Sequence, residues 1–393
     1  MKQMRGFTLA LAVSTLLTGA QDVQARGTVP SDAEGEVTFT AGATVHCGDT
    51  LTTHTRLTHD LNCPSSAPFA LQLDGADIVL DLGGYTIRRT GPANDESQGV
   101  VIARGRMVRN GTIRGFGSGI TTTFNAGTLY VRLHELALLD NNIGVYDQAS
   151  YGNFLITNSR LSGNGQGLSS AFDASDGNFD VRSSVFTHNA TAMIADFHNI
   201  DVLDSTFTSN GVVIHCFGGA FRVRGSTLAW NDAVGRMQFD FGGPYTCNNM
   251  RFENSLLANN ASFAPTAWPI WQTTRLEMVD TLAVSNGEGL EVQAETVYID
   301  GNTFHDNAEG LSLADLPAAV PTPLTGIVRG NQFLRSGNDG LRVLPPSTPT
   351  LINNVALGNA GIGIYAPTAI NGGGNVARDN GVADCVGIVC SMY

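Results

Sequence analysis

Four polar residues in the middle of the chain have side chains suited to acid–base catalysis: His215, Arg236, Asp196 and Glu291. An imidazole can act as a general base, and a guanidinium can stabilise a developing negative charge. Asp196 or Glu291 would then serve as the partner acid or orient the base. The alternative is that His215 is an inert surface residue and that Arg236 forms an ordinary ion pair, which stabilises little when it is exposed.

Aromatic and amide side chains near these residues could bind a sugar, because a flat ring can pack against the apolar face of a pyranose. The expected binding residues are Trp268, Trp271, Gln238, Gln293 and Tyr245. Three of them lie in stretches that look like lengthened turns. The alternative is that the aromatic rings pack these long turns onto the body of the protein.

A repeat of about 24 residues must position these side chains. Each unit has a short strand, a small polar pair, an apolar anchor, an Asn and a second short strand. The anchors are Ile87, Ile113, Leu138, Leu161, Phe186, Phe207, Leu228, Leu257, Ala283, Phe304, Phe333, Ala356 and Ala377.

Apolar residues alternate over three to five positions within each unit, as in Leu311-Ser312-Leu313. Alternation with period two indicates strands with one buried face, and stacked units bury a core that one unit could not. The sequence therefore predicts an all-β, single-stranded parallel β-helix of about 13 coils. We expect the helix over 69–370, an N-terminal cap over 26–68 and a C-terminal cap over 371–393.

This register places His215 next to Arg236 in an outward column that also contains Tyr146, Ser169 and Ile194. A second outward column contains Asp196, Phe217, Gln238, Gln293 and Ala314. Adjacent strands lie about 4.8 Å apart. We therefore expect Asp196, His215 and Arg236 to lie within reach of one another, with Glu291 two coils above Arg236.

Asparagines recur near one position of the coil, where their amides would bond to the coils above and below. They are Asn141, Asn164, Asn189, Asn210, Asn231, Asn260, Asn286, Asn307, Asn338, Asn359 and Asn380. A row of ligands is the functional alternative. Because the series runs the whole length of the repeat, we interpret it as a structural ladder.

The chain contains six cysteines, an even number typical of disulfides in exported proteins. Their order and the repeat register predict the pairs Cys47–Cys63, Cys216–Cys247 and Cys385–Cys390. The alternative of a metal site lacks any Cys-x-x-Cys pair, and we expect no bound metal through these residues.

The N-terminus has the layout of a secretory signal peptide over 1–25, with Lys2 and Arg5 before an apolar run and cleavage predicted before Arg26. The remaining chain would have 20 basic and 34 acidic residues and no lysine. This charge argues against binding to nucleic acid or anionic lipid. We expect a secreted or periplasmic monomer with no membrane span.

The segments CGDTLTTHTRLTHDLNCP from Cys47, DIVLDLGGYTIRR from Asp77 and NGGGNVARDNGVADCVGIVC from Asn371 resemble those of secreted bacterial β-helix repeat proteins. The chain as a whole resembles the pectin-lyase-like superfamily of right-handed parallel β-helices. The resemblance implies that the first and last disulfides cover the open ends of the helix. It does not specify one reaction.

We therefore expect a carbohydrate-active protein, either a polysaccharide lyase or another polysaccharide-modifying enzyme acting in a groove on the helix. The Asn-Thr-Asp, Gly-His-Gly and Asp-Pro-His signatures of known enzymes on this fold are absent. A non-catalytic extracellular or envelope binding protein is the main alternative, and small-molecule chemistry in an aromatic pocket is a third. We expect no cofactor, although Asp173, Asp176, Asn178 and Asp180 could hold calcium.

Overall fold

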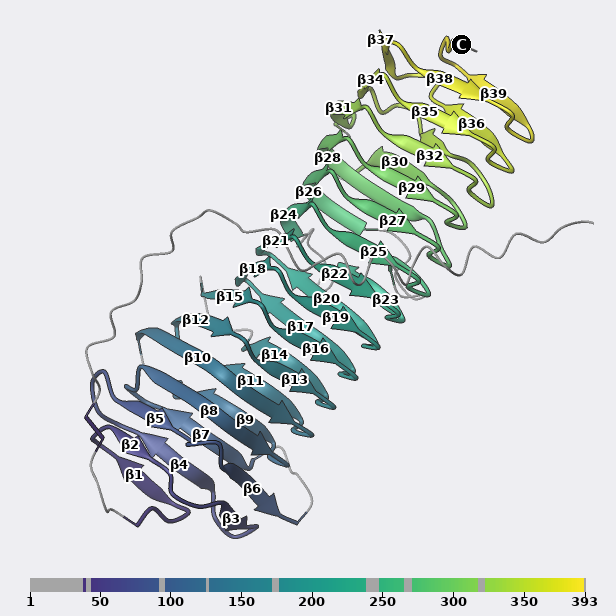
Figure 1. Ribbon diagram of the computed structural model, residues 1–393. Helices are drawn as coiled ribbons and strands as arrows, with labels where there is room; N and C mark the ends of the chain where they lie inside the picture. Colours follow the sequence, from purple (N-terminus) through teal and green to yellow (C-terminus); the bar gives the residue numbers. More distant parts are fainter. Residues whose placement is uncertain are drawn as a thin grey trace, which may run out of the picture. The chain divides into compact units, whose positions relative to one another are not determined.

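A computed structural model describes residues 38–39, 44–91, 96–124, 127–171, 177–237, 247–264, 271–316 and 322–391. The chain divides into two units, Met1–Thr38 and Phe39–Tyr393. The expected signal peptide lies outside the described residues. The second unit is an all-β parallel solenoid of about 13 turns, and no helix is found in the described ranges (Figure 1).

Each turn of the solenoid contributes strands to three faces, and every strand pairing is parallel. Face A contains β1 (Asp49–Leu51), β4 (Phe69–Leu73), β7 (Gln98–Ile102), β9 (Ser118–Thr122), β11 (Ile143–Asp147), β14 (Gln166–Ser170), β17 (Thr191–Asp196), β20 (Val212–Phe217), β23 (Ala233–Met237), the first half of β28 (Leu290–Asp300), β30 (Leu311–Asp315), β33 (Leu341–Val343), β36 (Ile362–Tyr365) and β39 (Ala383–Val386). The paired strands thus extend past 69–370 at both ends.

Face B precedes the polar pair of each repeat. It contains β2 (Thr55–Arg56), β5 (Val79–Asp81), β8 (Met107–Arg114), β10 (Thr128–Leu139), β12 (Tyr151–Thr157), β15 (Asn178–Arg182), β18 (Asn199–Leu203), β21 (Ala220–Arg224), β24 (Cys247–Glu253), β26 (Trp271–Val279), the second half of β28, β31 (Thr325–Arg329), β34 (Thr350–Ile352) and β37 (Ile370–Gly373).

Face C follows the polar pair and consists mostly of three-residue strands, together with the ends of β8 and β10. Its other strands are β3 (Leu61–Pro64), β6 (Thr86–Thr90), β13 (Arg160–Ser162), β16 (Val185–Thr187), β19 (Thr206–Thr208), β22 (Thr227–Ala229), β25 (Leu256–Ala258), β27 (Leu282–Val284), β29 (Thr303–His305), β32 (Gln332–Leu334), β35 (Val355–Leu357) and β38 (Val376–Arg378).

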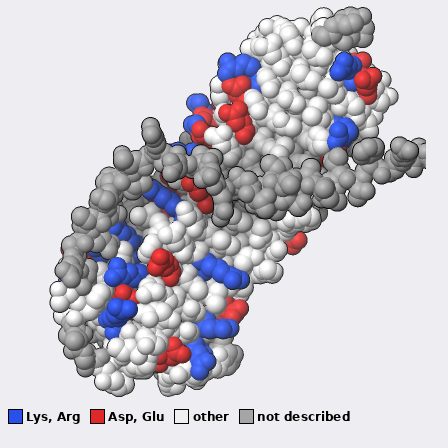
Figure 2. Space-filling view, viewed as in Figure 1, with Lys and Arg blue, Asp and Glu red and all other residues white. Residues whose placement is uncertain are grey.

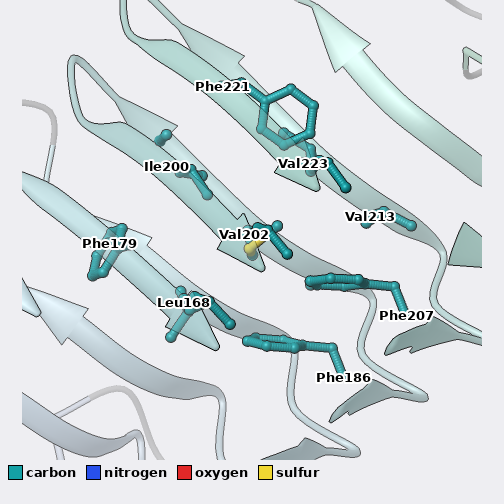
Figure 3. Packing of buried hydrophobic residues seen from close by; sticks show 14 of the residues in the cluster. Leu168, Phe179, Phe186, Ile200, Val202, Phe207, Val213, Phe221 and Val223 are labelled. Atoms are coloured by element: carbon teal, nitrogen blue, oxygen red, sulfur yellow. The ribbon is translucent and has the colours of Figure 1, made fainter. Parts of the chain in front are cut away.

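The predicted anchors lie at the centre of the face C strands and point into the core. Each anchor pairs in register with the next, from Ile87 and Ile113 to Ala356 and Ala377, and each is at most 1% exposed. Identical rings stack directly, as the parallel rings of Phe186 and Phe207 do with centroids 4.8 Å apart (Figure 3). The repeat predicted from the sequence is therefore confirmed.

Two sharp corners flank each face C strand from the Ile113 coil onward, because the residue three before and the residue two after the anchor have positive φ. The first corner, between faces B and C, is formed in successive coils by Gly84, Asn110, Glu135, Asn158, Ser183, Asp204, Gly225, Asn254, Asp280, Gly301, Gly330, Asn353 and Gly374. Gly and Asn adopt this left-handed backbone most readily. The conformational demand explains why small polar residues recur beside each anchor.

The asparagine ladder is confirmed at the corner between faces C and A. Asn189, for example, accepts a hydrogen bond from the Asn164 N–H at 3.1 Å, and its own N–H donates to Asn210 Oδ1 at 3.1 Å. Asn338 is wrong as a member, because the ladder occupies the third residue after each anchor and that residue is Ser336 after Phe333. Ser336 donates its N–H to Asn359 Oδ1 at 2.9 Å, whereas Asn338 is exposed.

A second ladder, which the sequence reasoning did not resolve, lies at the corner between faces B and C. From Ser159 to Ser255 it consists of serines, whose backbone N–H groups donate to the Oγ of the next coil. From Asn302 to Asn375 it consists of asparagines, with Thr281 as the junction.

Three disulfides join the predicted pairs Cys47–Cys63, Cys216–Cys247 and Cys385–Cys390. The first and last lie in the terminal coils, where they tie strands whose edges have no further coil to pair with. Cys216–Cys247 connects β20 on face A to the first residue of β24 on face B in the next coil. No helix long and apolar enough to span a membrane occurs in the described part of the chain.

Candidate functional site

The predicted outward column on face A has the register that the sequence indicated. Tyr146, Ser169, Ile194, His215 and Arg236 pair in that order. His215 is half-buried, and the Arg236 side chain lies outside the described part of the structure. In the same column nearer the N-terminus, Thr121 is only 1% exposed, so this stretch of face A is not an open groove.

Asp196 is half-buried at the end of β17 and pairs in register with Phe217, which is 5% exposed. Burial raises the pKa of the Asp196 carboxyl, and the nearby His198 opposes this shift. Asp196 therefore lies diagonal to His215 on the adjacent strand, next to a buried ring.

The expected place of Glu291, two coils above Arg236, stays a prediction, because the intervening coil lies partly outside the described ranges. Glu291 follows the ladder residue Asn286 by five positions, as His215 and Arg236 follow Asn210 and Asn231. On the intervening coil, Trp271 Nε1 donates to the carbonyls of Gly235 at 3.2 Å and Phe263 at 3.0 Å. Towards the C-terminus, Glu291 pairs in register with Ser312 on the next coil.

Trp271 is fully buried, so the expectation that it stacks on a sugar is wrong. Its ring lies parallel to Phe252 and edge-on to Phe263 in the core. Gln293 is half-buried and accepts a hydrogen bond from Gln272 Nε2 at 2.7 Å, which links two adjacent coils. Trp268, Gln238 and Tyr245 lie outside the described residues.

The expected calcium ligands cannot be compared as a set, because Asp173 and Asp176 are outside the described ranges. Asp180 accepts two hydrogen bonds from Arg182, at 2.9 and 2.6 Å. In the described residues, no group of three or more His, Cys, Asp or Glu side chains is placed to hold a metal ion.

A hollow that the sequence reasoning missed lies on the outer surface of face B, and we call it the tyrosine groove. Its floor has two columns, in which Tyr130, Asn153 and Asn178 lie in register beside Arg132, Leu155 and Asp180. Asp77 and Arg106 complete its wall. The Tyr130 ring is 72% exposed, so the groove combines an accessible aromatic ring with amides and both signs of charge.

The same columns continue along face B into a second hollow lined by Arg222, Asn249, Arg251, Arg275 and Glu277. Here the guanidiniums are paired: Arg251 lies 3.0 Å from Glu277 and 2.9 Å from Glu253, and Arg275 lies 2.6 Å from Glu277. Mixed clusters of basic and acidic side chains are also visible in Figure 2. This hollow therefore offers little unpaired charge to a ligand.

An acidic hollow at the corner between faces C and A contains Glu291. It is lined by Glu288, Glu291, Glu309 and Asn338 from three successive coils. Burial raises the pKa of the Glu309 carboxyl, and the negative charges of Glu291 and Asp339 add to the shift, while Arg342 opposes it. Glu309 is thus the carboxyl favoured to keep its proton, next to a second carboxylate.

A buried polar network supports the turn between faces A and B beside the tyrosine groove. His198 Nε2 lies 2.9 Å from Asp147 Oδ2, and both side chains are fully buried. Thr122 Oγ1 donates to the other Asp147 oxygen at 2.8 Å. Gly177 must lack a side chain, because a Cβ there would lie 2.0 Å from His198 Nε2.

Comparison of the chain with protein-family models, with curated proteins and with solved structures finds no match. The solenoid fold and the site geometry are therefore the basis for assigning a function.

Proposed function

We propose that the protein is a secreted, carbohydrate-active β-solenoid that binds a polysaccharide in the tyrosine groove. The observation that carries the proposal is the exposed ring of Tyr130, in register with the amides of Asn153 and Asn178. A sugar ring can pack its apolar face on the phenol, while its hydroxyls exchange hydrogen bonds with amides and carboxylates. Repetition of the amides on successive coils suits a repeating ligand.

Secretion is supported by two independent features. Three disulfides are characteristic of proteins from oxidising compartments. The first 25 residues have the charge and apolar pattern of a signal peptide.

Binding to a panel of soluble polysaccharides, measured by affinity electrophoresis and calorimetry, tests the proposal. Tyr130→Ala should weaken binding about tenfold, the equivalent of ~1.4 kcal/mol for an aromatic anchor. Trp230→Ala is the matched control, because Trp230 is 65% exposed but lies at the corner between faces C and A. Equal binding by the wild type and Tyr130→Ala would rule out the groove as the binding site.

Cleavage of a bound glycan is a second candidate function, favoured by Glu309, whose carboxyl pKa is raised by burial and by the neighbouring Glu291. Glycosidases use two carboxyl groups whose environments separate their pKa values, one as acid and one as base or nucleophile. New reducing ends that disappear in Glu309→Gln would support hydrolysis at this pair. Unsaturated products that disappear in His215→Ala and Arg236→Ala would instead support the lyase hypothesis on face A.

A non-catalytic extracellular or envelope protein is the alternative within the same binding proposal. Binding that depends on Tyr130 without new products from any polysaccharide would favour it.

A further inference from the structure

A hydroxyl, an imidazole and a carboxylate lie together on β10 and β12 at the edge of face B. His134 Nδ1 is 2.7 Å from Thr157 Oγ1 on the next coil. On the other side of the ring, His134 Nε2 is 3.6 Å from Glu135 Oε1. The His134 and Glu135 side chains are 35% and 58% exposed, so solvent and ligands can reach the group.

The negative charge of Glu135, 3.6 Å from Nε2, favours the tautomer that carries its proton on Nε2. In that tautomer Nδ1 accepts the hydrogen bond from the Thr157 hydroxyl. This order, hydroxyl to imidazole to carboxylate, is the arrangement that activates a hydroxyl nucleophile.

The backbone of Glu135 provides a second, independent observation. Glu135 has a φ of 51° and occupies the corner between faces B and C. The equivalent residue in each of the other coils described above is Gly, Asn, Asp or Ser. Unfavourable backbone geometry can be retained at functional sites. His188, Trp230 and Arg335 also have positive φ at the corner between faces C and A, so what sets Glu135 apart is its place among small residues at its own corner.

We propose that Thr157, His134 and Glu135 form an acyl-transfer site that hydrolyses esters. Thr157 Oγ1 attacks the ester carbonyl carbon while its proton passes to His134 Nδ1. The tetrahedral intermediate then breaks its bond to the alcohol oxygen, which takes the proton from Nδ1. Water attacks the resulting acyl-threonine, passes a proton to Nδ1, and Thr157 leaves with that proton, which releases a carboxylic acid and restores the site.

The surroundings indicate the class of ester. Thr157 lies two residues along β12 from Leu155 in the tyrosine groove, so an alcohol bound in the groove would present its ester close to the hydroxyl. Arg182 lies in register with Thr157 on the next coil, but its guanidinium is paired with Asp180 at 2.9 and 2.6 Å, so we assign it no role in stabilising the oxyanion. An O-acylated glycan is therefore the substrate class, and this identification of the alcohol depends on the proposed function.

Hydrolysis of p-nitrophenyl acetate tests the site without requiring glycan binding. Thr157→Val and His134→Gln should each lower kcat at least 100-fold, the scale of general-base catalysis. Thr206→Val is the matched control, because Thr206 is a half-buried threonine on face C, and it should leave the rate unchanged. Equal rates for the wild type and Thr157→Val would overturn the proposal.

Glu135 is a positioning residue, and two variants separate that role from a structural one. Glu135→Gly suits the corner backbone, so it should raise the midpoint of thermal unfolding while lowering kcat at least tenfold with little change in KM. Glu135→Asp keeps the carboxylate and should retain more of the rate than Glu135→Gly. A Glu135→Gly variant with wild-type kcat would refute the role of the carboxylate.

Release of acetate from an O-acetylated polysaccharide distinguishes the two proposals. Ester hydrolysis without dependence on Tyr130 would overturn the glycan assignment and leave the acyl-transfer site standing. Tyr130-dependent glycan binding without hydrolysis of either substrate would overturn the acyl-transfer site alone.

Discussion

Asn210 should be among the most sensitive polar positions in the solenoid. Its side chain is 1% exposed and joins three coils. Its Oδ1 accepts from the N–H and Nδ2 of Asn189 at 3.1 and 3.0 Å, and its Nδ2 donates to the Phe186 carbonyl and to Asn231 Oδ1, both at 3.0 Å. At roughly 1 kcal/mol net for each hydrogen bond, Asn210→Ala should lower the free energy of unfolding by about 4 kcal/mol.

Guanidinium denaturation followed by circular dichroism measures this loss. Asn338→Ala is the matched control, because Asn338 is an exposed asparagine outside the ladder, and it should change stability by less than about 0.5 kcal/mol. Asn210→Ser, which copies the natural residue at Ser336, should fall between the two. If Asn210→Ala and Asn338→Ala were equally stable, the ladder would not contribute as the hydrogen bonds indicate.

Two further perturbations test the electrostatics. In the Asp147–His198 pair, His198→Ala should lower the free energy of unfolding by about 3–5 kcal/mol, because it leaves the buried carboxylate without its imidazole partner. The double variant Asp147→Leu, His198→Phe should lose less stability than the two single variants together. Additive losses would contradict the coupling. On face B, the hydrogen bonds from Arg329 hold the pKa of Asp300 below its usual value, so this interaction contributes stability at neutral pH that is lost as the pH falls through the lowered pKa. Arg329→Gln should therefore lower the unfolding midpoint at pH 7 and converge with the wild type once the pH falls below the lowered pKa of Asp300. Arg104→Gln, at a more exposed pair with Asp74, should have a smaller effect. A difference independent of pH would refute the assignment.

The solenoid could be predicted because its two strongest constraints are local. Each face C strand buries one apolar anchor, and the residues at the corners must tolerate positive φ. Asn338 was misassigned because residue type was followed instead of distance from the anchor, which places Ser336 in the ladder. Counting three residues from Phe333 would have found it.

The candidate sites were harder to predict because they depend on which face is accessible. Alternation gave the face A register of His215 and Arg236, but sequence does not show that Thr121 in that column is covered. The same alternation applied to the strand before the polar pair would have found Tyr130, Asn153 and Asn178. Trp271 was misassigned because β26 continues around a corner and directs that ring inward.

The acidic hollow and the acyl-transfer site had weaker signals. Glu309 lies in the turn before β30 and lines the same hollow as Glu291 on β28, and strand alternation does not predict how close a turn comes to a strand of the adjacent coil. His134 and Thr157 are 23 residues apart, close to one repeat, so the repeat length itself is the signal that pairs them.

The second corner ladder gains asparagines along the solenoid, while the first keeps them in all but one coil. The first ladder has asparagine from Asn141 to Asn307 and again at Asn359 and Asn380. The other corner has serines and one threonine from Ser159 to Thr281 and asparagines from Asn302 onward. Where the first ladder has Ser336 instead of an asparagine, the other corner of the same coil has Asn331. Most C-terminal coils therefore have an asparagine at both corners, so the loss of one leaves the other in place. Around Asn210 the same change removes the only asparagine at the two corners of its coil, so tolerance to mutation should follow the number of corner asparagines and not the depth of burial.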